Sequence, residues 1–253
     1  MKKAIYSALA FTLLLAGCSG GGTKPASSAA PAGPDTAKGE GVMTYADYIA
    51  AADEDEVTVE AYVQAKQNWW EDTATIYAQD ADGGYFFYGV KCSEEDYAKL
   101  VEGQKIKVTG FKSTWSGEVE VVDGSFELEE GNWVAEAKDV TAALGTDALI
   151  NDQNLKVSFK GMKVEPSQNK DGQEVAWTYK WDDSGEEGDD LYFNVSSNGK
   201  TYSFTVESYL CDQNSDVYKA VKELKVGDVI DMEGFLYWYE GPNPHITSVK
   251  AAN

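Results

Sequence analysis

Two segments of the chain share one pattern of polar and apolar positions. They read GQKIKVTGF from Gly103 to Phe111 and GDVIDMEGF from Gly227 to Phe235, and they align position by position. Alternation of apolar and polar residues with a period of two predicts a β-strand with one buried face. We expect the first glycine of each copy at the turn into the strand, and the second at a bend or bulge.

The residues around these two segments predict the same order of elements in both halves. An amphipathic stretch before each copy, at 93–101 and 215–224, predicts a short helix. Thr44 followed by Asp47 predicts a capped helix start, which 146–150 mirrors in the second half. Alternating segments predict the strands, at 57–61, 73–79, 84–90, 103–111 and 117–122, and then at 157–162, 191–195, 201–206, 227–235 and 246–249.

Three strands, a helix and two more strands in each half resemble the OB-fold. The repeated glycine pair is similar to that of anticodon-binding and bacterial periplasmic OB-fold proteins. The resemblance implies a mostly β chain with short helices, in which two tandem OB-fold-like five-stranded barrels span 43–140 and 141–253. The second half carries an insertion, chiefly at 165–190, which we expect to form a loop.

The N-terminus predicts an export signal. Lys2 and Lys3 precede a short apolar stretch that ends in Leu15-Ala16-Gly17-Cys18, which resembles the lipobox of bacterial lipoproteins. The resemblance implies a signal peptide over 1–17, fatty acylation of Cys18 and attachment to the extracytoplasmic face of a bacterial cell membrane. The alternative is a plain secretory signal with an incidental cysteine. Residues 18–42, rich in Gly, Ala, Ser and Pro, predict a flexible tether.

The charge of the chain is strongly negative. Its 253 residues include 21 lysines, no arginine and 43 acidic residues, which gives a formal net charge of −22. Affinity for nucleic acid comes largely from Lys and Arg that neutralise phosphates. The chain departs here from the nucleic-acid-binding OB-folds, so we expect no nucleic-acid partner.

Aromatic residues gather where OB-folds bind their ligands, beside strands two and three and between the loops that join strands one to two and four to five. Six of the seven tryptophans fall in these four loops. We expect them to contact a saccharide, a peptide or a partner protein. The alternative is that they cap the barrel ends or pack the two domains together. The candidate residues are Trp69, Trp70, Trp115, Trp177, Trp181, Tyr237, Trp238 and Tyr239.

Residues for catalysis or metal binding are sparse. His245 is the single histidine, and it has no companion nucleophile motif. The acidic run at 182–190 offers oxygen ligands for Ca²⁺, but lacks EF-hand spacing and also fits a solvated loop. Cys92 and Cys211 occupy matching places in the two halves, and we expect two buried thiols rather than a disulfide.

Together these features predict a non-catalytic protein without cofactor or metal. We expect a lipid-anchored extracytoplasmic binding or scaffold protein that contacts a saccharide, peptide or protein partner through its aromatic loops. The alternative hypothesis is an envelope hydrolase or enzyme subunit that uses paired carboxylates, since 43 acidic residues leave room for such a pair.

Overall fold

The computed structural model describes residues 33–252, which all fall in one compact unit. The signal peptide, Cys18 and most of the expected tether lie outside the described residues. No helix in the described part of the chain is long and apolar enough to cross a membrane.

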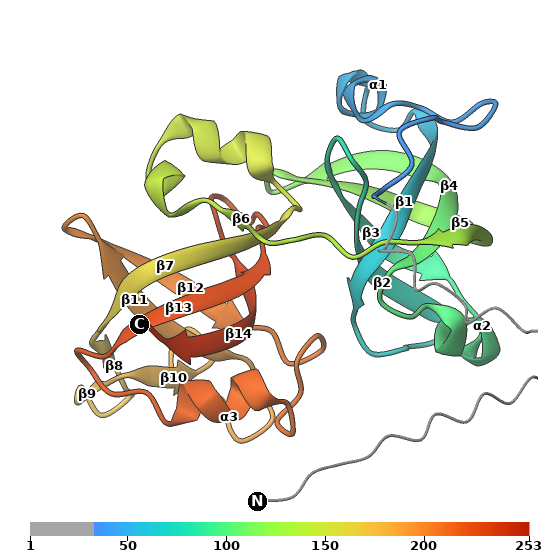
Figure 1. The fold of residues 1–253 in the computed structure, drawn as a ribbon. Helices are drawn as coiled ribbons and strands as arrows, with labels where there is room; N and C mark the ends of the chain where they lie inside the picture. Colours follow the sequence, from blue (N-terminus) through green and yellow to red (C-terminus); the bar gives the residue numbers. More distant parts are fainter. Residues whose placement is uncertain (1–32, 253) are drawn as a thin grey trace, which may run out of the picture. The chain divides into compact units, whose positions relative to one another are not determined.

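The first barrel is a closed ring of five strands (Figure 1), in the order β1-β2-β3-β5-β4. Every pairing in the ring is antiparallel except that of β3 with β5. A cluster of buried apolar side chains from all five strands fills it. Its elements are α1 (Tyr45–Ala50), β1 (Glu56–Lys66), β2 (Thr73–Gln79), β3 (Gly84–Lys91), α2 (Glu94–Lys99), β4 (Gln104–Trp115) and β5 (Glu118–Asn132).

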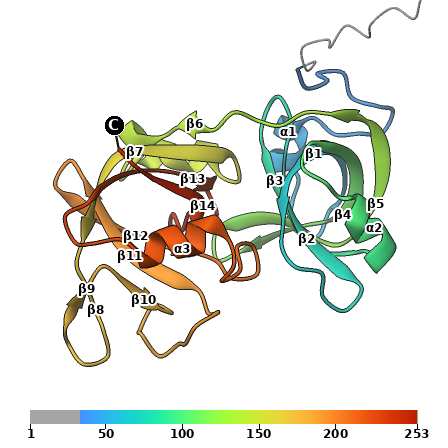
Figure 2. The same cartoon turned by 60° about the horizontal axis from the view of Figure 1, so that its bottom comes forward.

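The second barrel repeats the same ring, because β11 pairs with both β12 and β7 and so closes β7, β11, β12, β14 and β13 into a circle. Helix α3 packs beside β14 (Figure 2). Tandem OB-like five-stranded barrels are thereby confirmed. The elements are β6 (Lys138–Asp139), η1 (Thr141–Ala143), η2 (Asp147–Asp152), β7 (Lys156–Glu165), β8 (Ser167–Gln168), β9 (Glu174–Val175), β10 (Trp177–Tyr179), β11 (Leu191–Ser197), β12 (Lys200–Val206), α3 (Asp216–Lys222), β13 (Val229–Phe235) and β14 (His245–Ala251).

The repeated glycines do what the sequence predicts. Gly103 and Gly227, at the turns into β4 and β13, have φ of +88° and +95°, a region that favours glycine. Gly110 and Gly234 lie at shifts of strand register, where a strand bends. A Cβ on Gly234 would come within 2.2 Å of the carbonyl oxygen of His245. The second glycine therefore permits the close approach of neighbouring strands.

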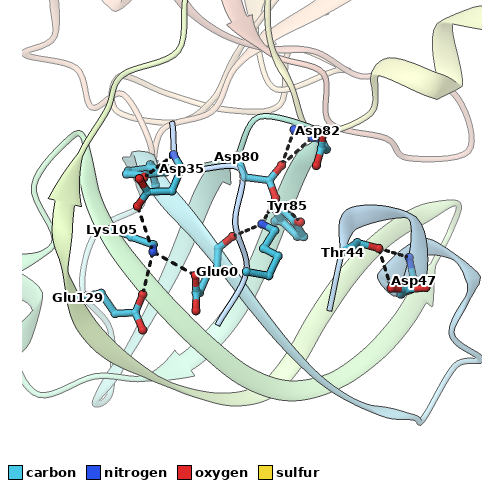
Figure 3. Close-up of polar contacts among 12 residues, drawn as sticks. Asp35, Thr44, Asp47, Glu60, Asp80, Asp82, Tyr85, Lys105 and Glu129 are labelled. Atoms are coloured by element: carbon cyan, nitrogen blue, oxygen red, sulfur yellow. Dashed lines mark hydrogen bonds and ion pairs between the residues drawn. The ribbon is translucent and has the colours of Figure 1, made fainter. Parts of the chain in front are cut away.

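The three short α-helices begin where the sequence predicts, at Thr44, Ser93 and Ser215, whose side chains accept hydrogen bonds from the first turn. Figure 3 shows the first of these caps, in which the Oγ1 of Thr44 accepts from the backbone N–H of Asp47 at 3.1 Å. The expected helix at 146–150 is present as the 3₁₀ helix η2.

The expectation that 165–190 forms only a loop is wrong. The segment contains the hairpin of β8 and β9 and the strand β10, which adds to the edge of β11. Trp177 pairs with Phe193 there, and the indole donates a hydrogen bond to the carbonyl of Lys222 at 3.2 Å. These apolar side chains gain a packing surface on the second barrel, which gives the insertion regular structure.

Ion pairs hold residues 35–38 against the first barrel (Figure 3). The carboxylate of Asp80 accepts from the Nζ of Lys38 at 2.5 Å and from the hydroxyl of Tyr85 at 2.8 Å. The Nζ of Lys105 lies 3.0 Å from Glu60, and contacts Asp35 as well. The end of the expected tether thus packs on the barrel, and these two lysines are neutralised by neighbouring acids.

Candidate functional site: a cleft at the junction of the barrels

The outward face of β2, β3 and β5 is covered rather than open to solvent. Side chains alternate along a strand, so Tyr77 and Phe86 point away from the barrel core that Ile76 and Phe87 fill. Yet Tyr77 is 0% exposed and Phe86 is 3% exposed. We call the outward side chains of these three strands the covered face; its members used below are Tyr77, Phe86, Glu118 and Glu120, with Tyr88, 56% exposed, at its edge.

Aromatic side chains of the second barrel cover this face. Phe235, at the end of β13, stacks on Tyr77 with 4.7 Å between ring centroids. Tyr237 meets the edge of Phe86 at 5.2 Å and stacks on His245 at 4.4 Å. Stacked and edge-on aromatic pairs add about 0.5–1.5 kcal/mol each beyond the area that they bury. The two barrels therefore share a third, smaller apolar core.

Hydrogen bonds cross the same junction. The hydroxyl of Tyr77 lies 2.6 Å from the Nδ1 of His245, and both groups are buried. The backbone N–H of Trp238 donates to the Oε2 of Glu118 at 2.9 Å, and Gln153 donates to the carbonyl of Gly117 at 2.8 Å. Buried polar contacts of this kind fix one geometry, because a shift would leave their groups without partners.

Two glycines allow the barrels to approach closely. A Cβ on Gly84 would lie 2.3 Å from the backbone of Asn154, and one on Gly117 would lie 2.8 Å from the ring of Trp238. Neither distance is compatible with a larger residue unless the neighbour moves. At both positions the glycine backbone is thus in direct contact with the second barrel, with the backbone of Asn154 at Gly84 and with the ring of Trp238 at Gly117.

Between the covered face and the second barrel remains a cleft of about 460 Å³. Its size is that of a small-molecule site. Aromatic rings and two acidic side chains make up most of its wall. The lining residues are Gln67, Phe86, Tyr88, Trp115, Glu120, Glu207, Tyr237 and His245.

The two acids in the cleft are buried and poorly partnered. Glu120 is 7% exposed and makes no hydrogen bond or ion pair with any described residue. Glu207 accepts from the backbone N–H of Tyr209 at 3.0 Å through one oxygen, while its Oε2 is buried without a partner. Burial raises the pKa of Glu120 and that of Glu207 to about 7. The nearby Glu118, 0% exposed, has its pKa raised by burial to about 8.

His245 starts β14 and lies at the junction of the two barrels. Burial lowers the pKa of its imidazole to about 3, so the ring is neutral at physiological pH. The ring acts as a packing surface for Tyr237 and as the hydrogen-bond partner of Tyr77.

The structure divides the eight aromatic candidates into separate groups. Trp115 and Tyr237 line the cleft, Tyr239 packs on Trp115 with 5.2 Å between ring centroids, and Trp238 packs against Gly117. The other four lie outside the cleft. Trp69 donates a hydrogen bond to Cys92 within the first barrel, Trp177 belongs to β10, and Trp70 and Trp181 are exposed, at 69% and 80%.

Sequence reasoning missed five lining residues, namely Gln67, Phe86, Tyr88, Glu120 and Glu207. Phe86 and Tyr88 belong to Gly84-Tyr-Phe-Phe-Tyr88, where aromatic residues occupy successive positions. Aromatic residues on both faces of a strand favour burial of both faces, so this run carried a signal. Glu120 alternates with buried valines as on a solvated strand, and Glu207 follows β12; neither pattern reveals the second barrel above it.

The remaining candidates lie outside the junction. Cys92 is a buried free thiol and Cys211 a half-buried one. In the acidic run, Glu187 pairs with Lys222 and Asp189 pairs with Lys180. Among residues 33–252, no group of three or more His, Cys, Asp or Glu side chains has the arrangement of a metal site.

No family model matches the chain, and no curated protein matches it. Similar solved structures include a murine DNA binding protein bound with dsDNA, 13% identical, which covers 78% of this chain and 98% of its own at a TM-score of 0.36. The Ifi202 HINa domain in complex with 20-bp dsDNA is 11% identical. The match covers 79% of this chain and 97% of that domain, at a TM-score of 0.34. A Replication Protein A heterotrimer bound to ssDNA is 10% identical. The match covers 77% of this chain and 49% of the other, at a TM-score of 0.29.

These structures correct two expectations. The expectation of no nucleic-acid partner and that of a saccharide, peptide or protein partner are both wrong against these neighbours, which are structures with bound DNA. We withdraw both, together with the alternative of a hydrolase. That this chain is not an enzyme stays a prediction. TM-scores of this size assign no ligand to this chain.

Proposed function

We propose that the chain is a binding protein for a small organic molecule, which it takes up in the cleft between its two barrels without catalysing a reaction. The observation that carries the proposal is the Oε2 of Glu207, a buried carboxyl oxygen in the wall of this aromatic cleft that has no hydrogen-bond partner among the described residues. A buried polar group without a hydrogen bond costs free energy, and a ligand that supplies the missing bond recovers it.

The setting of the cleft supports a binding role. It adjoins β2 and β3, the strands that OB-folds use for ligands, and stacked rings of both barrels fix its aromatic wall. We further propose that the protein works on the extracytoplasmic face of a bacterial cell membrane, anchored by a lipid on Cys18. The motif at residues 15–18 supports this location, and mass spectrometry of the N-terminal peptide would test it.

A binding screen with paired tryptophan variants tests the proposed site. Full-length protein is titrated calorimetrically with a panel of small amines, alcohols, carboxylic acids and nucleosides, and with a 20-bp DNA duplex. Trp115 lines the cleft and Trp70 does not, although both are exposed tryptophans of the first barrel. We expect Trp115→Ala to weaken binding of a panel compound about tenfold, and Trp70→Ala to leave it unchanged.

Two results would contradict the proposal. One is a panel in which no small compound binds. The other is binding of the duplex alone, with an affinity that Trp115→Ala does not change; this would replace the cleft by a nucleic-acid surface elsewhere on the protein.

A further inference from the structure

We propose that the cleft selects a small molecule that carries a protonated primary or secondary amine beside an apolar body. This inference rests on the proposed function, since it names the ligand class of the same cleft. Three properties of the wall lead to it: its acidic side chains, its unpaired buried carboxyl oxygen and its aromatic rings.

Acidic side chains line the cleft from both barrels. Glu120 comes from β5 of the first barrel, and Glu207 directly follows β12 of the second. The one basic side chain in the lining, His245, is neutral because burial lowers its pKa to about 3. A ligand phosphate or carboxylate would face these acids without a counter-charge, whereas a cation would neutralise them.

The wall contains a buried carboxyl oxygen that lacks a hydrogen-bond donor. An ionised carboxylate only accepts hydrogen bonds. The Oε2 of Glu207 is buried without a partner among the described residues, and Glu120 lines the same cleft. An ammonium N–H supplies a charge-assisted bond, which is stronger than a bond between neutral groups. A quaternary ammonium has no N–H to give, so the missing bonds point to a protonated amine.

The aromatic rings suit the rest of such a ligand. Phe86 lies directly beside Glu120 in the pairing of β3 with β5, so an ammonium at the carboxylate is next to a ring. A cation over an aromatic face gains about 0.5–2 kcal/mol. Tyr88, Trp115 and Tyr237 complete an apolar wall, against which the hydrocarbon part of the molecule would pack.

Three compounds of nearly equal shape test the inference on the full-length protein. Phenethylamine offers charge and N–H donors, its N,N,N-trimethyl derivative offers charge alone, and phenethyl alcohol offers neither charge nor ammonium donors. Calorimetric titrations are run at a pH of about 8, where the carboxyls are largely ionised and the amine is still protonated. We expect phenethylamine to bind at least about tenfold more tightly than either analogue.

A matched pair of variants locates the effect. Glu120→Gln should weaken phenethylamine about tenfold and abolish its advantage over the alcohol. Glu130→Gln is the control, because Glu130 is an exposed glutamate of the same strand and does not line the cleft. Unchanged binding of the alcohol and an unchanged circular dichroism spectrum show that the Glu120→Gln protein keeps its cleft. Glu207→Gln should act in the same direction as Glu120→Gln.

The outcomes separate this inference from the proposed function. If the alcohol or the trimethyl derivative binds as tightly as the amine, the ligand class is wrong; loss of that binding in Trp115→Ala would still uphold the cleft as a site. Equal affinity of Glu120→Gln and wild type for the amine also overturns the inference. If no compound of the wider panel binds, the proposed function fails and the inference fails with it.

Discussion

The two barrels share one ring of strands, but they use equivalent positions for opposite purposes. Phe111 and Phe235 end the same glycine-bent strand motif. Phe111 is 42% exposed, whereas Phe235 is 2% exposed and stacks on Tyr77 of the other barrel. The two phenylalanines hold the same position in their barrels, so that position does not determine how far each is buried. Contact with the neighbouring barrel determines it.

The outward faces of the equivalent strands differ in the same way. On β2 and β3 the outward side chains include Tyr77 and Phe86, which the second barrel covers. On β11 the outward positions hold Tyr192, Asn194 and Ser196, which are half-buried. The comparison shows that repeating a barrel does not repeat its surface: the first barrel provides the cleft, and the second provides its cover.

The largest expected effect is on the two matched phenylalanines. Phe235→Ala should lower the free energy of unfolding by about 3–5 kcal/mol, because it leaves a cavity under Tyr77. Phe111→Ala should cost about 1 kcal/mol or less, because that ring is partly exposed. Urea unfolding followed by circular dichroism measures both. Equal losses would mean that the junction does not bury Phe235 as described.

The next effect is a pH dependence of stability that arises at Glu118. Burial raises its folded pKa to about 8, above the ordinary value near 4.3 in the unfolded chain. Between these values the folded state binds more protons than the unfolded state, so stability falls as pH rises from about 5 to 8. Glu118→Gln should remove about 3–4 kcal/mol of that fall. Urea unfolding at several pH values measures it, and parallel curves for both proteins would contradict the assignment.

The smallest effect separates backbone strain from packing. Gly117 and Gly227 have φ of +92° and +95°, so alanine at either position should cost about 1–2 kcal/mol of strain. At Gly117 a Cβ also meets Trp238, whereas nothing lies within 4 Å of one at Gly227. We expect Gly117→Ala to lower the free energy of unfolding by about 1 kcal/mol more than Gly227→Ala does. Thermal unfolding of the two variants provides the comparison, and equal losses would argue against close contact at Trp238.

The sequence predicted the fold well because the fold depends on local signals. Alternation gave the strands, Thr44 and Ser93 gave the helix starts, and the glycine pair gave the turn and bend of β4. The second copy of the same signals predicted the second barrel. These features are determined by neighbouring residues of the chain, and so one sequence is enough to find them.

The cleft was predicted only in part because it is formed by residues far apart in sequence. Trp115 and Tyr237 were among the candidates, and the alternative that aromatic residues pack the domains together describes Trp238. Glu120 was not found, because an acid that alternates with valines has the pattern of a solvated strand. Only the position of the second barrel makes it a buried group, and no local pattern encodes that position.

A double-mutant cycle between Tyr77 and Phe235 tests most directly whether the second barrel covers the ligand face of the first. Tyr77→Leu, Phe235→Leu and the double variant are unfolded with urea beside the wild type, and leucine keeps both positions apolar. With ring centroids 4.7 Å apart, the account predicts a coupling free energy of about 1 kcal/mol. Strictly additive losses would contradict it, because side chains that do not touch have no coupling.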